Sequence, residues 1–599
     1  MELGVEFPVL KANTYFNSLL AFVTSVTKPC LILFDITYST ITMPKNHNSD
    51  RRDFLKFSAL AGLATTVQLP FAGQALANDA DKKTVPPNRL TLLITSDLHE
   101  QLNTHDEFFW ENGKAVYRKR GGLASLKTLI DRERTLNPTN TLLLDGGDYF
   151  HGHAVASLTE GEALIPLLNE FNYDLILPGN WEVVYKKHKM LYDMGHAHAA
   201  KICANMWHDD TNELIFPPYW TKYIAGVKVG FIGYTDHLIP KRQSPDYSKG
   251  IRFAHADANV AKYIKLLREV EGCGIVILMT HMGLAQQVGL ANNPAVEGTD
   301  FIIGADTHER IRVPIEGKYA KVIECGAFGS FLGKLDIEVE NGKMKSYRYA
   351  LMDVDPAKYP ANKKVQQMVD EARKPFAAEL DRVIGTTTTP LVRYFVMETP
   401  MDNLLTDAIQ WKFKPDIALS NGFRFCQPLA IDPKKGKAEI TKEFLWNMLP
   451  VDSEAKTGVV TGKQVWDWLE KELQNAFAKD PSKRFGGWFV RYAGMEVNFT
   501  INNEFGKRVN WVKVGGTPID MNKEYRIVAC EREGDPDDTI CRMEKVKEPK
   551  RLGILMHDVI EDYLKQHSPV APKLENRATA TDFPATLLTQ LQGTTYEFS

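Results

Sequence analysis

Five short apolar segments of the chain each end just before side chains that can bind a metal ion. The segments are Leu90–Thr95, Thr141–Leu144, Leu175–Leu177, Ile275–Thr280 and Phe301–Ile303. The side chains that follow them are, in order, Asp97 and His99, Asp148, Asn180, His281, and Asp306 with His308. Carboxylate, imidazole and amide ligands suit Mn, Zn or Fe rather than a thiolate site. Two such ions, about 3.5–4 Å apart and bridged by a carboxylate, would clamp the attacking and leaving oxygens of a displacement reaction.

The apolar segments must bring these side chains together. From Arg89 to about Asp355, short apolar runs alternate with helical patterns, which is typical of an α/β domain. Continuous apolar strands suit a sheet that is covered on both faces, and open α/β sheets place their sites at the carboxyl ends of strands. A single Asp-x-His or Gly-Asp group is more often a turn or a helix cap. Five such groups, each directly after a strand, predict one metal site.

Length and composition exclude several classes of protein. The chain has 599 residues, of which 44% are hydrophobic and 25% charged, so it is not largely disordered, collagen-like or a coiled coil. A formal net charge of −3 provides no chain-wide basic field, and we expect no nucleic-acid partner. Seven cysteines are too few for a disulfide scaffold. Cys530 and Cys541 bracket a polar loop, and a disulfide between them would suit an oxidising compartment.

The first 77 residues are predicted to be a leader. A twin-arginine pattern at Arg51-Arg52 precedes an apolar run over 57–69 and a small-residue cleavage site at 75–77. We expect Met43 to be the initiator, the signal to span about 43–77, and the protein to be periplasmic. The competing interpretation is a membrane helix over 15–36, but charged residues and a proline interrupt it, whereas a span needs about 20 apolar residues. No stable membrane insertion is therefore expected after cleavage.

The rest of the chain is predicted to contain two domains. The first covers 88–355 and is followed by a linker helix over 362–385, which Pro375 kinks or breaks. The second covers 386–575, and a polar tail over 576–599 is expected to be peripheral. Nothing in the sequence predicts an oligomeric state.

The metal-binding motifs resemble those of the calcineurin-like metallophosphoesterases, and within them the two-domain 5'-nucleotidase family. Supporting segments are Arg120-Gly121-Gly122-Leu123-Ala124, Cys203-Ala204-Asn205, residues 324–333 and Asn421-Gly422-Phe423-Arg424. The resemblance implies an N-terminal four-layer α/β/β/α domain and a C-terminal 5'-nucleotidase-type α+β domain that closes over the substrate. It also implies two divalent metal ions, the first held by Asp97, His99 and His308. The second would be held by Asn180, His281 and Asp306, with Asp148 as the bridging ligand. Asp306 departs from the family, which usually has His there, and a carboxylate favours a harder ion such as Mn.

A second departure concerns the catalytic acid. The family carries Gly-Asn-His-Glu-x-Asp, whose His and Asp stabilise the transition state. Here Trp181 and Val184 replace both members, and indole can only donate one N–H. Losing a positioned acid typically costs about 10²–10⁴-fold in rate. Either His151 or His153, just after Asp148, takes over this role, or the reaction needs less proton transfer.

The segment Trp181-Glu182-Val183-Val184-Tyr185 is similar to that of a relative with the same fold, the thiosulfohydrolase of the Sox sulfur-oxidation system. That enzyme has a dinuclear Mn site and releases sulfate from a sulfur chain on a carrier protein. Arg120 and residues 486–491 also look similar. Against this, Tyr149-Phe150 stands where that branch has Thr-Trp, and Gly487-Trp488 stands where it has Gly-Asp-Met. Trp181 and Tyr185 join Asn180 and the two histidines as candidate catalytic residues.

The second domain contains candidate substrate-binding residues. In the nucleotidases two aromatic side chains sandwich the base, and the matching positions here are Phe423 or Phe425 with Trp488. Arg393 and Arg424 could hold an anion in a bidentate manner. The competing interpretation is that the aromatic residues are simply core, since a buried Phe is common.

These observations favour an exported hydrolase with two divalent metal ions, Mn before Zn or Fe, acting on a small anionic, nucleotide-like phosphoester. The first alternative is sulfate release from a sulfur chain on a carrier protein. The second alternative is a binding protein that has lost catalytic turnover. Against it, every expected type of metal ligand except the one at Asp306 is present at its position.

Overall fold

The computed structural model describes residues 88–422, 426–589, 591 and 598. The predicted leader and Phe423, Arg424 and Phe425 lie outside the described residues. Among the helices that are described, none has the length and apolar character that crossing a membrane would require.

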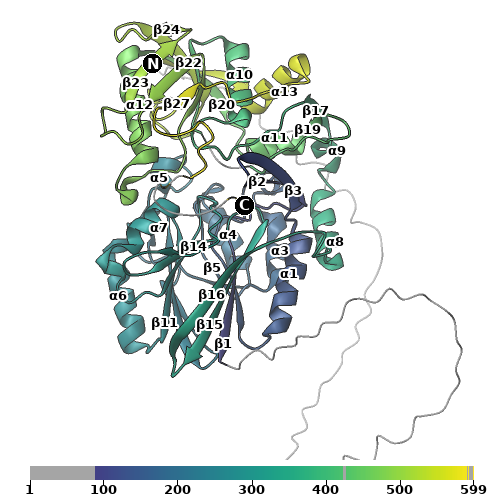
Figure 1. Ribbon diagram of the computed structural model, residues 1–599, viewed down its shortest axis with the longest axis vertical. Helices are drawn as coiled ribbons and strands as arrows, with labels where there is room; N and C mark the ends of the chain where they lie inside the picture. The colour runs from purple at the N-terminus through teal and green to yellow at the C-terminus, as the bar shows by residue number, and fades with distance from the viewer. Residues whose placement is uncertain (1–87, 423–425, 590, 592–597, 599) are drawn as a thin grey trace, which may run out of the picture. The chain divides into compact units, whose positions relative to one another are not determined.

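The first domain contains two six-stranded sheets (Figure 1). The first sheet has the order β16 (Lys343–Asp353), β15 (Phe331–Glu340), β1 (Arg89–Thr95), β4 (Thr141–Asp145), β5 (Leu175–Ile176) and β6 (Ala200–Lys201). The second has the order β13 (Ile315–Glu316), β14 (Lys321–Glu324), β12 (Phe301–Gly304), β11 (Ile275–His281), β9 (Val227–Thr235) and β8 (Tyr219–Ile224). The strands that precede the predicted ligands pair in parallel: β1 with β4, β4 with β5, and β11 with β12. Their carboxyl ends therefore meet at one edge of each sheet.

The two sheets pack face to face and are covered by helices on their outer faces. Between the sheets lies one apolar cluster, which includes Leu92, Leu144, Ile277 and Ile303. Helices α1 (Leu123–Leu136), α3 (Ile165–Phe171), α4 (Lys186–His196) and α8 (Lys363–Arg373) cover the first sheet, and α6 (Val260–Lys265) and α7 (Leu284–Ala291) cover the second. The predicted four-layer α/β/β/α architecture is confirmed. Strands β1, β4 and β11 are buried along almost their whole length because they have cover on both faces.

The linker is interrupted where Pro375 lies. Helix α8 ends at Arg373 and the short α9 (Ala377–Leu380) begins four residues later, because proline removes a backbone donor and clashes with the preceding turn. Val365 and Val369 of α8 are buried in the core of the first domain.

The second domain is built on a mixed five-stranded sheet and a smaller four-stranded one. The larger has the order β21 (Arg491–Ala493), β18 (Ile417–Ser420), β25 (Glu524–Cys530), β20 (Glu454–Thr461) and β26 (Lys547–Leu555). The smaller has the order β24 (Thr517–Pro518), β23 (Val509–Val514), β22 (Met495–Phe499) and β27 (Ala578–Ala580). The main helices are α10 (Pro400–Phe413), α11 (Lys442–Met448), α12 (Gly462–Phe477) and α13 (Met556–His567). Helix α12 begins with a capping box in which Thr461 and Gln464 satisfy each other's backbone N–H groups.

The tail was expected to be peripheral, and this expectation is wrong. Strand β27 pairs in parallel with β22, and the Phe598 carbonyl accepts a hydrogen bond of 3.1 Å from the Trp110 backbone N–H in the first domain. Phe598 also packs against Phe108 and Tyr394. A polar composition concealed the few apolar side chains that anchor the segment.

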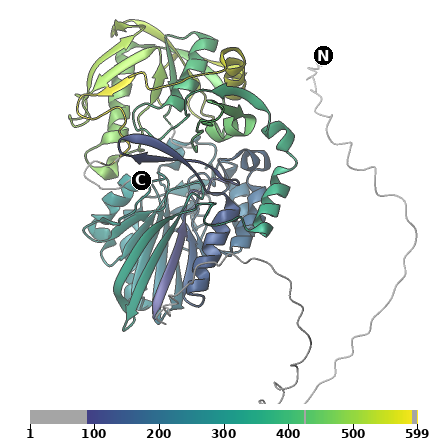
Figure 2. The ribbon, with the colours of Figure 1, turned by 45° about the vertical axis from the view of Figure 1, so that its right-hand side comes forward.

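A hairpin of the first domain reaches the second. It consists of β2 (His105–Glu111) and β3 (Lys114–Arg120), drawn in dark blue between the two domains in Figures 1 and 2. Asp106 accepts a hydrogen bond of 3.0 Å from the Ala430 backbone N–H, and Glu107 accepts one of 2.8 Å from the Tyr394 hydroxyl. Glu107 is fully buried and also pairs with Arg310, so a charged network joins the two domains.

Candidate metal centre

The predicted metal ligands come together at the carboxyl ends of the strands. Asp97 and His99 follow β1, Asp148 follows β4, Asn180 follows β5, His281 ends β11, and Asp306 and His308 follow β12. All seven side chains are buried. Five of these residues have left-handed backbone conformations, with φ of 51° at Asp97, 47° at His99, 63° at Asp148, 90° at Asp306 and 62° at His308. Such conformations are costly for residues other than glycine and cluster at functional sites.

Two sets of three ligand atoms each fit a metal ion. The first set is Asp97, His99 and His308, and the second is Asp97, Asp148 and His281; within each set the ligand atoms lie within 4.8 Å of one another. Asp148 Oδ2 is 3.1 Å from His281 Nε2 and 3.8 Å from His99 Nε2. This carboxylate approaches a histidine of each set, as a bridging ligand must, and so does Asp97, whose Oδ1 lies 3.6 Å from His308 Nε2 and 3.8 Å from His281 Nε2. The bridging role of Asp148 stays a prediction.

Backbone carbonyls orient two of the histidines. His99 Nδ1 donates to the His151 carbonyl at 2.8 Å, and His281 Nδ1 donates to the Gly146 carbonyl at 2.7 Å. With the proton on Nδ1, each Nε2 presents a lone pair to the ligand set, and this is how ligating histidines are usually held.

The charges of the site also fit bound cations. Burial raises the pKa of Asp97 well above its ordinary value. The nearby His281 has the largest effect in the opposite direction. Asn180 Oδ1 is buried and accepts no hydrogen bond from the residues that the structure describes. Burying neighbouring carboxylates and an amide oxygen without a hydrogen bond costs free energy, unless these groups are paired or coordinate a metal ion. The donor set, without a thiolate, fits divalent cations.

Asp306 has contacts that the sequence did not predict. Its Oδ2 lies 2.9 Å from Arg242 Nη1, and its Oδ1 accepts hydrogen bonds from Arg242 Nη2 at 3.1 Å and Asn180 Nδ2 at 2.9 Å. It lies beside the second set of ligands but belongs to neither of the two sets above. Its role as a metal ligand stays a prediction.

Two residues that the sequence analysis did not single out hold the Asp148 and Asn180 loops together. The Glu182 carboxylate accepts hydrogen bonds from the backbone N–H groups of Asp148 (3.1 Å), Tyr149 (2.7 Å) and Gly179 (2.5 Å). A side chain at Gly179 would place its Cβ 2.2 Å from Asp148 Oδ1, so only glycine allows this approach. Gly179 and Glu182 are the Gly and Glu of the family's Gly-Asn-His-Glu-x-Asp segment, and this match was the signal that could have found them.

The position of the missing dyad is occupied by stacked rings. The Trp181 indole stacks on the His151 imidazole at 4.5 Å between centroids, and His151 Nδ1 lies 3.1 Å from the Tyr185 hydroxyl. Burial lowers the pKa of His151 to about 3. Val184 is buried and apolar. His151, Trp181 and Tyr185 thus form one cluster beside the metal ligands.

His153 is placed differently. Its ring caps the N-terminus of α2 (Ala154–Thr159) by accepting from the Val155 N–H, and its Nε2 lies 3.1 Å from Glu443 of the second domain. These contacts are structural. Of the two histidines proposed as replacement acids, only His151 lies against Trp181.

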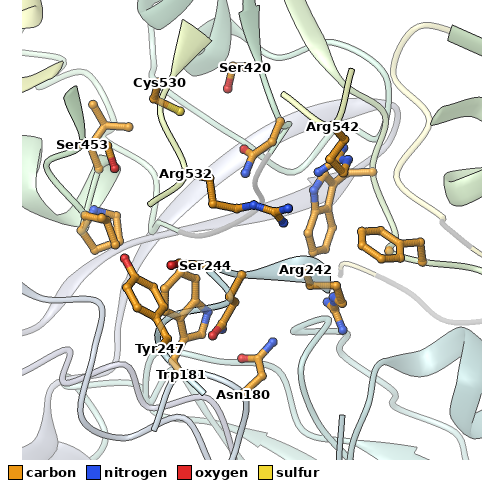
Figure 3. Close-up of a pocket in the computed structure, with 18 of the residues that line it drawn as sticks. Asn180, Trp181, Arg242, Ser244, Tyr247, Ser420, Ser453, Cys530, Arg532 and Arg542 are labelled. Atoms are coloured by element: carbon orange, nitrogen blue, oxygen red, sulfur yellow. The ribbon is translucent and has the colours of Figure 1, made fainter. Parts of the chain in front are cut away.

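Four of the predicted metal ligands border a cavity of about 210 Å³ between the two domains (Figure 3). Asp148, Asn180, Trp181, Asp306 and His308 of the first domain line it, as do Arg393 and Trp488 of the second. Arg393 donates to Asp402 at 3.0 Å and to the Met448 carbonyl at 2.9 Å. The structure therefore brings two of the five predicted substrate residues to the site, while the other three lie outside the described residues.

Other lining residues were missed by sequence reasoning: Arg242, Tyr247, Phe485, Arg532 and Arg542. They lie in or next to irregular connections that follow no motif. The expected disulfide is absent, because Cys530, which lines the cavity, and Cys541 are both free thiols. Burial raises the pKa of Cys541 to about 12.

Comparison with known proteins matches both domains in order. Residues 90–310 match the calcineurin-like phosphoesterase family, and residues 383–531 match the 5'-nucleotidase C-terminal domain. The chain is 24% identical to Protein UshA of Escherichia coli (strain K12) over 550 residues, which cover 83% of this chain and 94% of that protein. It is 23% identical to the 5'-nucleotidase of Vibrio cholerae, over 85% of this chain and 96% of that one. It is 25% identical to the trifunctional nucleotide phosphoesterase YfkN of Bacillus subtilis over 84% of its own length, but spans only 36% of that longer protein.

Two solved structures share the fold. The sulfate thiohydrolase SoxB of Thermus thermophilus superposes with a TM-score of 0.73 at 20% identity, covering 84% of this chain and 98% of that one. A 5'-nucleotidase precursor from Thermus thermophilus superposes with a TM-score of 0.71 at 22% identity, covering 83% and 100%. With both domains matched in order and the ligand sets in place, the chain belongs to the two-domain 5'-nucleotidase family of calcineurin-like metallophosphoesterases and is a metal-dependent hydrolase.

Proposed function

We propose that this protein is an exported hydrolase that uses two divalent metal ions to cleave a small anionic, nucleotide-like phosphoester. The observation that carries the proposal is the pair of ligand sets that border a cavity lined by arginine and aromatic side chains. The relatives named 5'-nucleotidase, which this chain matches over most of its length, support the same substrate class.

Side chains of the first domain would hold the two cations. Asp97, His99 and His308 would hold one cation, and Asn180, His281 and Asp306 the other, with Asp148 bridging the two. Bound there, the two cations would activate water and offset the negative charge that develops on the ester. We favour Mn over Zn or Fe, because the set is rich in hard oxygen donors, the more so if Asp306 contributes.

The second domain would bind the rest of the substrate. Trp488 and Phe485 line the cavity and offer flat faces for a planar base. Arg393 would bind the anionic group of the substrate. Its guanidinium is held in place by Asp402. Phe423, Phe425 and Arg424 remain proposed partners in the same role.

Export is part of the proposal. The twin-arginine pattern at Arg51-Arg52 supports a route that carries folded proteins, and a cofactor-loaded hydrolase suits that route. The mature enzyme would begin near Asn78 and act in the periplasm.

A second candidate reaction is sulfate release from a sulfur chain bound to a carrier protein. Trp181 favours it, because its ring lines the cavity and stacks on His151 where nucleotidases have their catalytic histidine. An indole cannot protonate a leaving alkoxide, whereas it can border a channel for an extended, unbranched substrate.

One screen decides between the two reactions. Mature protein loaded with Mn would be assayed with nucleoside monophosphates, sugar nucleotides, bis-p-nitrophenyl phosphate and a thiosulfonated carrier peptide. Turnover of the phosphoesters without turnover of the peptide supports the proposal. The reverse pattern overturns it in favour of sulfate release. If none of the substrates is turned over, the protein is a binding protein rather than an enzyme.

A further inference from the structure

Arg242 is a partly buried arginine of the first domain that lines the cavity next to the predicted metal ligands. It ends α5 (Ile239–Arg242), which follows β9. Its Nη1 donates to Asp236 at 2.8 Å and lies 2.9 Å from Asp306, so two carboxylates hold the guanidinium. Its Nε makes no hydrogen bond with the residues that the structure describes.

Arg542 is the corresponding arginine of the second domain. Glu472 of α12 holds it in a bidentate pair, with Nε at 3.0 Å and Nη2 at 2.6 Å. Its Nη1 has no hydrogen-bond partner in the described part of the chain. As with Arg242, one side of the guanidinium is anchored while another N–H group remains available.

The two arginines line the same cavity and are labelled on the same side of it in Figure 3. Burial lowers the pKa of Arg542, Glu472 raises it above the ordinary value, and the positive charge of Arg242 opposes that rise. Carboxylates already balance both charges, Asp236 and Asp306 beside Arg242 and Glu472 beside Arg542, so a further anion would be bound by the N–H groups that remain. Arg532 differs, because its Nε and Nη2 are engaged by Asp535 and its Nη1 by the Lys241 carbonyl.

We propose that Arg242 and Arg542, one from each domain, form a clamp for one tetrahedral oxyanion of the substrate, a phosphate or sulfate group. The idea rests on the proposed function and extends it by naming the residues that grip the anion. Guanidinium groups fixed by carboxylates lose little entropy on binding and match the geometry of oxyanion edges. Because the clamp needs both domains, an anion would also favour the arrangement in which they face each other.

The test is the binding of inorganic phosphate to the metal-loaded protein, measured by calorimetry. We expect Arg242→Gln and Arg542→Gln each to raise the dissociation constant about tenfold to a hundredfold, since a charge-assisted hydrogen-bond pair is lost. The control is Arg382→Gln, an exposed arginine that pairs with Glu379 and Glu561 outside the cavity; it should leave binding unchanged. Competition by sulfate then shows which oxyanion the clamp prefers.

Each result decides the matter. If both cavity variants weaken phosphate binding and bind the wild-type amount of metal, the clamp is supported. If neither differs from the control, or only one does, the clamp is wrong. Should Arg242→Gln fail to fold or lose metal because Asp306 is left unpaired, Arg242→Lys and Arg542→Gln carry the same test. Phosphate binding does not require ester hydrolysis, so an enzyme that cleaves no phosphoester would refute the proposed function and leave this result intact.

Discussion

The Nε2 atoms of His99 and His308 lie 3.0 Å apart, although 209 residues separate the two histidines in the chain. Burial lowers the pKa of His99 well below its ordinary value, and His308 lowers it further. Both influences favour the neutral form of His99, which is the form that ligates a cation. Asp97 Oδ1 lies 3.6 Å from His308 Nε2, so the three side chains converge as the ligands of one cation do.

The two neighbouring histidines should behave differently on substitution. His151→Asn should lower kcat by up to about 10²-fold, because the His151 ring, kept neutral by its lowered pKa, positions Trp181 beside the metal ligands. His153→Asn should lower the melting temperature, because it removes the contact with Glu443 although Asn can still cap α2, and should change kcat less than about twofold. Steady-state kinetics and thermal unfolding of both variants test this. A larger loss of kcat in the His153 variant would contradict the assignment.

The pair between Glu443 and His153 predicts a pH dependence of stability. Burial raises the pKa of Glu443, but hydrogen bonds from His153 and Arg373 outweigh it and lower the pKa from 4.5 to about 2. A lowered folded-state pKa stabilises the protein fully above about pH 4.5, and this contribution is lost as the pH falls toward 2.

Glu443→Gln should therefore lower the free energy of unfolding by about 2–3 kcal/mol near neutral pH. The difference from wild type should shrink below about pH 4.5. Urea unfolding at a series of pH values measures it, with the exposed Glu371→Gln as the control. A difference that stays constant down to about pH 3 would show that Glu443 is not held ionised by these partners.

The sequence predicted the metal ligands better than the substrate cavity, for physical reasons. Asp97, Asp148 and His281 follow buried strands, and parallel pairing brings strand ends together whatever the loops do. Arg242 and Arg542 lie in or beside connections whose course depends on how the two domains pack. Strand β27 could not be predicted either, since its partner β22 lies about 80 residues away and only three of its own residues pair.

Asp306→His tests the residue that departs from the family. Imidazole is softer than carboxylate, so the variant should prefer Zn over Mn more than the wild type does. The change also removes the carboxylate that pairs with Arg242, and breaking a buried ion pair costs about 3–5 kcal/mol. Metal competition and thermal unfolding measure the two effects. An unchanged metal preference with lower stability would show that Asp306 serves Arg242 and not the metal.

Rebuilding the dyad separates the two candidate reactions. Trp181→His with Val184→Asp restores the residues that nucleotidases carry beside Asn180. A phosphoesterase with a weakened site should gain activity on nucleotides, at most about 10²–10⁴-fold. If the native reaction is instead sulfate release, the double variant should lose it and gain little on nucleotides. Kinetics of both proteins on both substrates distinguish these outcomes, with Trp181→Phe as the control for the stack on His151.

The central claim is that Asp148 bridges two metal ions, and metal analysis of Asp148→Asn tests it most directly. Asp145→Asn is the matched control, because Asp145 is equally buried but bonds Thr95 and the Gly147 backbone. We predict about two bound ions per chain in the wild type and in the Asp145 variant, and fewer than two with no turnover in the Asp148 variant. A full complement of metal in folded Asp148→Asn protein would contradict the account.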